Sequence, residues 1–125
     1  MKYASAEDRL NPVPPEDADE STLGGYTAVH GRAAAFEGCD GEPYTAGMET
    51  DASDDPDRPV AGYLVFIRWA QTGSAIMGHL ETGDLVTART EDEARALLQA
   101  LPLREVRALL DEAIARKRAG ADGEA

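Results

Sequence analysis

Residues 63–83, YLVFIRWAQTGSAIMGHLETG, are the stretch that decides the predicted fold. The first half is rich in β-branched and aromatic residues and too densely apolar for a surface helix, which favours a β-strand. Thr72-Gly73 is typical of a two-residue turn, so a return strand is expected over residues 75–82. The sequence therefore predicts an antiparallel hairpin.

The turn implies a register, and the register sorts the side chains of the hairpin. With Thr72-Gly73 at the turn, Trp69 faces Ile76 and Val65 faces Leu80. Because side chains alternate along a strand, one face is then almost wholly apolar and is expected to carry the helices. The residues of this expected core face are Val65, Ile67, Trp69, Ile76 and Leu80.

The opposite face of the hairpin combines apolar and charged side chains. Antiparallel sheets commonly leave one face in water, where Arg68 and Glu81 would keep their charged groups solvated. Alternatively, the face is a contact surface, because aromatic residues, Met and Arg are enriched in interfaces. A catalytic role would need a positioned partner and a cleft. The residues of this candidate binding face are Leu64, Phe66, Arg68, Met77, His79 and Glu81.

Strand patterns also flank the hairpin. Residues 32–51 read as two short strands around the turn dipeptide Asp40-Gly41, and residues 52–59 read as an acidic loop. Residues 85–88 read as a further short strand. The sequence therefore predicts three to five antiparallel strands that follow one another along the chain.

The last third of the sequence has helical patterns. Thr90 and Glu93 form a capping box at the start of one amphipathic helix. Pro102 ends that helix and suits the first turn of a second. The three basic residues 116–118 are expected at the C-terminal end of the second helix, where the helix dipole favours cations.

Strands that precede helices, rather than alternate with them, predict an α+β fold. We expect an antiparallel β-meander of three to five strands followed by two C-terminal amphipathic helices packed on one sheet face. The single domain is expected over residues 29–118. Residues 1–28 are expected to be a disordered acidic tail, and residues 119–125 a second disordered tail, because neither offers much to bury.

The charge and hydropathy of the sequence limit the classes of function that we expect for the protein. The formal net charge is −12, and residues 1–59 hold 14 of the 24 acids but 4 of the 12 bases. No basic patch precedes residue 104, so direct binding to nucleic acid or to an anionic membrane is not favoured. No apolar run reaches the ~18 residues of a membrane span, and the N-terminal residues lack the apolar core of a signal peptide. A cytoplasmic location is therefore expected.

No motif with a known chemistry appears in the sequence. The acidic stretch 51–57, DASDDPD, lacks the central Gly and the final Glu of a calcium loop. Cys39, His30 and His79 are the soft metal ligands, and their spacing does not match a zinc site. Acids surround Cys39 and should raise the pKa of its thiol. Phosphate-binding glycine loops are absent. We therefore predict no catalytic residue, no metal and no cofactor.

These observations favour a non-enzymatic interaction or accessory module that binds a protein partner or self-associates as a homodimer through the mixed face. One alternative is a protein, or a minor enzyme, that binds a small anionic molecule through Arg68 and His79. A further alternative is an acidic adaptor that binds a basic protein through residues 1–59.

Overall fold

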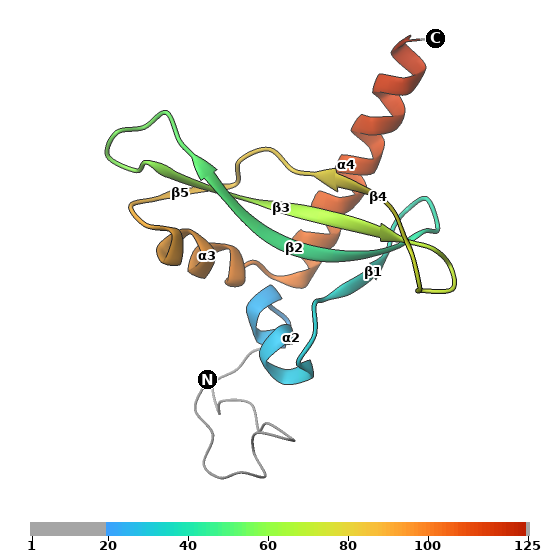
Figure 1. Ribbon diagram of the computed structural model, residues 1–125, viewed down its shortest axis with the longest axis horizontal. Coiled ribbons are helices and arrows are strands. Elements are labelled where there is room, and N and C mark those ends of the chain that lie inside the picture. The colour runs from blue at the N-terminus through green and yellow to red at the C-terminus, as the bar shows by residue number, and fades with distance from the viewer. Residues whose placement is uncertain (1–19, 125) are drawn as a thin grey trace.

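The computed structural model describes residues 20–124 of the 125-residue chain (Figure 1). It confirms the predicted α+β class with an antiparallel sheet and helices after it. The helices are α2 (Leu23–His30), α3 (Glu91–Gln99) and α4 (Leu103–Glu124). The strands are β1 (Ala35–Glu37), β2 (Pro43–Ala52), β3 (Val60–Trp69), β4 (Ile76–Glu81) and β5 (Val86–Ala88).

The first four strands form a meander in which each strand pairs with the next along the chain. The order is β1-β2-β3-β4, and every pair is antiparallel. The short strand β5 also pairs with β3, at the end that β4 does not reach. Strand β3 therefore lies at the centre of the sheet and contacts three other strands.

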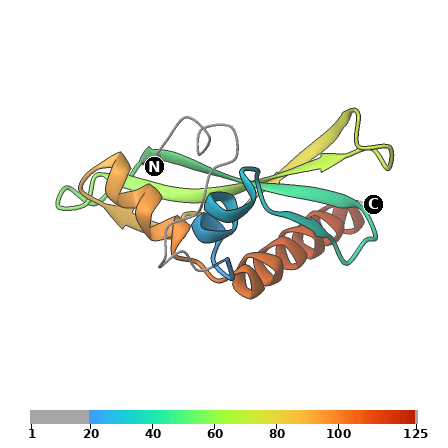
Figure 2. The same cartoon turned by 90° about the horizontal axis from the view of Figure 1, so that it is seen from below.

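The helices cover one face of the sheet, and the core lies between them. Figure 2 shows α2 and α4 on the same side of the strands. Leu64 and Phe66 of β3 are fully buried there. The helices contribute Leu23 from α2, Leu98 from α3, and Val106, Leu110 and Ile114 from α4.

Helix α2 lies inside the segment predicted to be a disordered tail. Thr22 caps its N-terminus by accepting a hydrogen bond from the Gly25 N–H, and Gly31 ends it in the left-handed conformation, at φ 66°. Leu23 is 3% exposed, and its N–H donates to the Leu101 carbonyl. The prediction was therefore wrong for residues 23–28. This helix is held by contacts with residues that are distant in sequence, which the local pattern does not reveal. Residues 1–19 lie outside the described part of the chain.

Helix α4 is longer than predicted. It continues to Glu124, whereas the predicted helix ends at residue 118. The basic residues 116–118 therefore lie within the helix and not at its negative end. This changes the environment of Lys117 and Arg118, as described below.

A β-bulge corrects the predicted register of the central hairpin. Trp69 pairs with Ile76 as predicted, but Arg68 pairs with Gly78, so Met77 is an extra residue on β4. Beyond it every partner is shifted by one position: Val65 faces Glu81 and not Leu80. Since a one-residue shift moves side chains to the other face, the predicted sorting of the hairpin is wrong beyond the bulge.

The expected core face also proved to be the uncovered one. Val65, Ile67 and Trp69 lie on the face opposite Leu64 and Phe66, and Ile76 is 62% exposed. Of the five residues expected in the core, Leu80 alone lies on the helix side, partly buried against the core.

Within residues 20–124, no helix has both the length and the apolar character that a membrane span requires.

Candidate functional site

The structure divides the predicted binding face between three places. Leu64 and Phe66 are fully buried under the helices, so neither is available to a partner. Arg68 lies on the same side of β3, at the edge of the core. Met77 protrudes at the bulge and is 56% exposed. The remaining two predicted residues lie on the opposite face.

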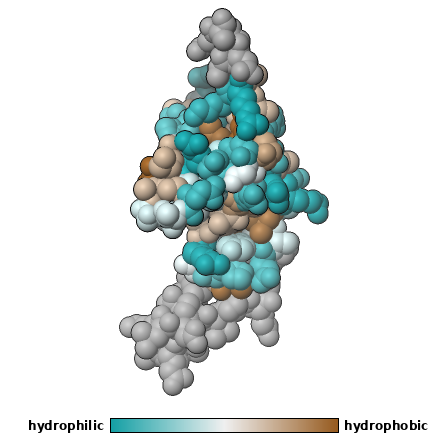
Figure 3. Space-filling model, turned by 90° about the vertical axis from the view of Figure 1, so that its right-hand side faces the viewer, coloured by the Kyte–Doolittle hydropathy of each residue, from teal (hydrophilic) through white to brown (hydrophobic). Residues whose placement is uncertain are grey.

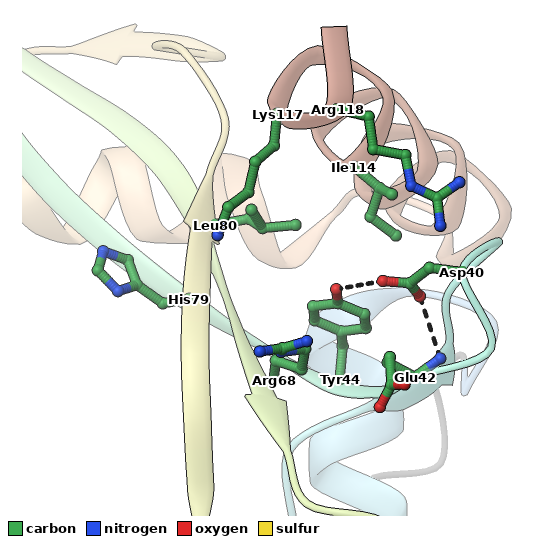
Figure 4. Close-up of a pocket in the computed structure, with 9 residues that line it drawn as sticks. All are labelled: Asp40, Glu42, Tyr44, Arg68, His79, Leu80, Ile114, Lys117 and Arg118. Atoms are coloured by element: carbon green, nitrogen blue, oxygen red, sulfur yellow. Dashed lines mark hydrogen bonds between the residues drawn. The ribbon is translucent and has the colours of Figure 1, made fainter. Parts of the chain in front are cut away.

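His79 and Glu81 are neighbours on the uncovered face. His79 Nε2 lies 3.8 Å from Glu81 Oε1, and both side chains are more than half exposed. The contact becomes an ion pair when the imidazole is protonated. His79 and Arg68 both line the cavity described below, but the His79 side chain points away from Arg68, so the two side chains do not form one binding pair (Figure 4).

We call the uncovered side of the sheet the open face. Its apolar part follows the central strand, because Tyr63, Val65, Ile67 and Trp69 alternate with the buried residues of β3. All four are half-buried by their neighbours in the sheet. The Trp69 indole N–H donates to Thr45 Oγ1 on β2 at 2.9 Å, which fixes the ring against the sheet. Ile76, which pairs with Trp69, extends this apolar surface to the hairpin end, and Met77 is exposed beside it at the bulge.

One end of the open face is acidic. Glu49 pairs with Tyr63 across the β2–β3 ladder, and Glu81 pairs with Val65 across the β3–β4 ladder. Desolvation and the carboxylates of Glu81, Glu49, Asp51 and Asp84 raise the pKa of Tyr63. The apolar stripe therefore runs from a carboxylate-rich end near Tyr63 to a less acidic end at Trp69 and Ile76, where Glu37 of the outer strand β1 pairs with Pro43 on the same face.

A second feature is a cavity of about 450 Å³ on the helix side of the sheet. It lies between the β1–β2 loop, the hairpin end of β3 and β4, and the C-terminal half of α4 (Figure 4). Leu80 and Ile114 supply its apolar walls. The charged and polar residues that line it are Asp40, Glu42, Tyr44, Arg68, His79, Lys117 and Arg118.

Asp40 and Tyr44 form a hydrogen-bonded pair at one side of this cavity. The Tyr44 hydroxyl donates to Asp40 Oδ2 at 2.8 Å, and the Glu42 N–H donates to Asp40 Oδ1 at 3.0 Å. Desolvation and this hydrogen bond raise the pKa of Tyr44 well above its ordinary value, and the positive charge of Arg68 partly opposes the rise. The predicted Asp40-Gly41 turn is thus confirmed, with Gly41 at φ 80°.

Cys39 lies beside this loop, next to α4. Its N–H donates to Asp111 Oδ1 at 3.0 Å. Desolvation and the Asp111 carboxylate raise the pKa of the Cys39 thiol, while Arg118 has the opposite, smaller effect. The predicted direction is confirmed, but the main charge comes from a helix residue distant in sequence.

Sequence reasoning assigned Lys117 and Arg118 to a helix end and missed their place in the cavity. Both residues are exposed and lie on the part of α4 that faces the β1–β2 loop. A signal was available, since three consecutive basic residues are unusual in a chain of net charge −12. Their partner Arg68 could not be identified without the packing of α4.

Within residues 20–124, no three side chains of His, Cys, Asp or Glu gather closely enough to hold a metal ion. Comparison with family models, with curated proteins and with solved structures found no match to this chain.

Proposed function

We propose that the protein is a non-enzymatic interaction module that self-associates through its open face, and that the occupant of this face is a second copy of the chain. The observation that carries the proposal is the apolar stripe of β3. Tyr63, Val65, Ile67 and Trp69 face away from the core, and none of the described helices covers them.

The composition of this surface supports an interface. Ile76 is 62% exposed and continues the stripe at its hairpin end, and Met77 at the bulge beside it is 56% exposed. Aromatic residues and Met are enriched at interface centres, whereas charged residues are depleted there. The row of β3 side chains follows this pattern, because the carboxylates of the open face lie on the strands beside β3 and not on β3 itself.

The distribution of charge favours a two-fold arrangement of two copies. In an antiparallel, face-to-face pair, the Tyr63 end of one copy lies over the Trp69 end of the other. The carboxylates of Glu49 and Glu81 then lie over the less acidic Trp69 end instead of over each other, and Glu37 at that end is on the outer strand β1, away from the stripe. A parallel pair would place these carboxylates together and would be repelled.

The size of the face is compatible with a dimer. The β2–β3 ladder contains nine residue pairs, which at ~3.3 Å per residue corresponds to a length of about 30 Å. With β1 and β4 on either side, the footprint is roughly 500 Å² before side-chain relief is counted. Standard interfaces bury ~800 Å² per partner, which is of the same order.

Sedimentation equilibrium of the full chain tests the proposal. The wild type is expected at twice the chain mass of 13.3 kDa. Ile67→Lys places a charge at the centre of the stripe and should shift the protein to monomer. Leu97→Lys is the matched control, because Leu97 is a 43% exposed apolar residue on α3 and the charge change is identical. This control should remain dimeric.

Salt dependence separates self-association from the binding of a basic partner. Two chains of net charge −12 repel, so screening by salt should tighten the dimer, whereas binding to a basic protein would weaken. A wild type that remains monomeric at high protein and salt concentrations would overturn the proposal. Equal loss of the dimer in the Leu97→Lys and Ile67→Lys variants would overturn it too.

A further inference from the structure

The cavity beneath α4 lies on the helix side of the sheet, opposite the open face. An inference about this cavity is therefore independent of the open face. We infer that this cavity binds a small organic phosphate, such as a phosphomonoester, through Arg68, Lys117 and Arg118. The argument rests on the charge, the hydrogen bonding and the shape of the cavity.

Three cations line the cavity, against the two carboxylates of Asp40 and Glu42. Figure 4 shows the Lys117 side chain extending from α4 toward Leu80 and β4, and the Arg118 side chain extending toward Asp40, with Arg68 across the cavity from the helix. Among the described residues, none of the three cations lies within ion-pair distance of a carboxylate. Acids outnumber bases two to one in this chain, so three such cations around one cavity indicate a site for an anion.

Arg68 is held in place for this role by the bulge. One guanidinium nitrogen, Nη2, donates to the Met77 carbonyl at 3.2 Å. The guanidinium lies over Gly78, where an added Cβ would be 3.8 Å from Arg68 Nε. This single backbone contact orients the group and leaves most of its five N–H donors for a ligand.

The two acids that line the cavity have other partners. The Asp40 carboxylate accepts from the Tyr44 hydroxyl and the Glu42 N–H, as described above. Glu42 Oε2 accepts from Gln71 Nε2 at 3.3 Å. These contacts hold the loop that forms one wall, and they direct both carboxylates toward neutral donors of the protein.

The shape of the cavity defines the rest of the ligand. Its volume of about 450 Å³ is within the range of small-molecule sites, which is ~300–1,000 Å³. Leu80 and Ile114 offer apolar contacts beside the cations. The end of the molecule that carries the hairpin and the β1–β2 loop is mostly hydrophilic, with small hydrophobic areas between the charged side chains (Figure 3). The combination fits a ligand in which an anionic group is joined to an apolar group.

A phosphate fits these cations better than a carboxylate does. Guanidinium groups bind phosphate through two parallel N–H···O bonds, and a phosphomonoester carries close to two negative charges at neutral pH. Two Arg and one Lys around the cavity offer three positive charges and many N–H donors to such a group. A carboxylate has two oxygens and one charge, and would leave part of the cluster unpaired.

Titration of the full chain with phenyl phosphate tests the inference, with inorganic phosphate and benzoate as comparison ligands. NMR amide shifts report both the affinity and the location. Phenyl phosphate should bind more tightly than either comparison ligand, with the largest shifts at Tyr44, Leu80 and Ile114. Loss of one charge-assisted contact in Arg68→Gln should weaken binding by about tenfold or more.

Two further variants keep the test decisive. Lys117→Gln alters an exposed position of α4, so the fold should be retained while phenyl phosphate binding weakens by about threefold or more. Arg104→Gln makes the same change in charge at an exposed residue near the start of α4 and should leave the affinity unchanged. An Arg104→Gln effect equal to that of Lys117→Gln would overturn the inference, as would the absence of shifts in the cavity at about 10 mM phenyl phosphate. Equal affinity for benzoate would overturn the assignment of phosphate.

Discussion

Tyr44 connects the β1–β2 loop to the sheet through one hydrogen bond. Its ring is 3% exposed and packs in the core, while its hydroxyl donates to Asp40 at the edge of the cavity. Such a phenol is stabilised in its protonated form, because ionisation would place a second negative charge beside the carboxylate. The pKa of Tyr44 is therefore raised in the folded state, and the tyrosine contributes to stability while it stays protonated.

Replacement of this residue tests that contribution. We expect Tyr44→Phe to lower the free energy of unfolding at pH 7 by about 1–3 kcal/mol, because Asp40 loses a hydrogen bond while the ring stays buried. Urea denaturation monitored by circular dichroism measures the difference. An unchanged midpoint would show that the hydroxyl contributes nothing.

The pH dependence follows from the direction of the pKa shift. The folded pKa of Tyr44 is above its ordinary value of 10.0, so the folded state keeps this proton more tightly than the unfolded state. Stability from this group is complete below pH 10 and is lost as the pH rises further. The wild type should therefore lose stability above pH 10 more steeply than Tyr44→Phe. Tyr63 shifts in the same direction and contributes equally to both proteins.

At the scale of elements, β3 shows what the sequence could and could not predict. Its strand character was clear from its β-branched and aromatic residues, and the strands and the two C-terminal helices were predicted correctly. The strand is apolar on both faces, with Leu64 and Phe66 on one side and Val65 and Ile67 on the other. Alternation therefore could not identify the buried side.

The bulge at Met77 was the second feature of the sheet that the sequence did not predict. The predicted register held near the turn, where Ala70 N–H donates to the Ala75 carbonyl at 2.8 Å and Trp69 faces Ile76. One extra residue then exchanged the faces of the remaining β4 side chains. A bulge depends on how the sheet twists against the helices, so the local sequence around Gly78 did not reveal it.

Gly62 is the point where α3 and β5 approach β3 most closely. A Cβ at this position would lie 2.8 Å from Val86 Cγ2 and 3.0 Å from Leu98 Cδ1, and Leu98 is fully buried. We expect Gly62→Ala to lower the free energy of unfolding by about 1–3 kcal/mol through overpacking. Thermal denaturation of the purified variants measures this effect.

Gly47→Ala is the matched control for that measurement. Gly47 lies on the exposed side of β2, and an added Cβ would meet one atom, the Val65 carbonyl oxygen, at an ordinary 3.7 Å. The stability of this variant should stay within about 1 kcal/mol of the wild type. If both variants lose the same stability, the cause is strand propensity and not the packing of α3.

At the scale of the whole molecule, the sheet separates two surfaces with different chemistry. The helix side carries the core and, at one end, a cavity with three cations. The open face carries an apolar stripe with carboxylates at one end. The sequence placed Arg68 on a candidate binding face with Glu81, whereas in the structure Arg68 lines the cavity with Lys117 and Arg118, which come from a helix distant in sequence.

The most direct test of the open face as a dimer interface is isotope-filtered NMR on a mixture of labelled and unlabelled chains. The antiparallel pairing predicts intermolecular contacts between the Val65 methyl groups of one copy and the Ile67 methyl groups of the other, and between the Tyr63 ring of one copy and the Trp69 ring of the other. Intermolecular contacts that arise from α3 or α4 instead, or none in a protein of monomer mass, would contradict the account.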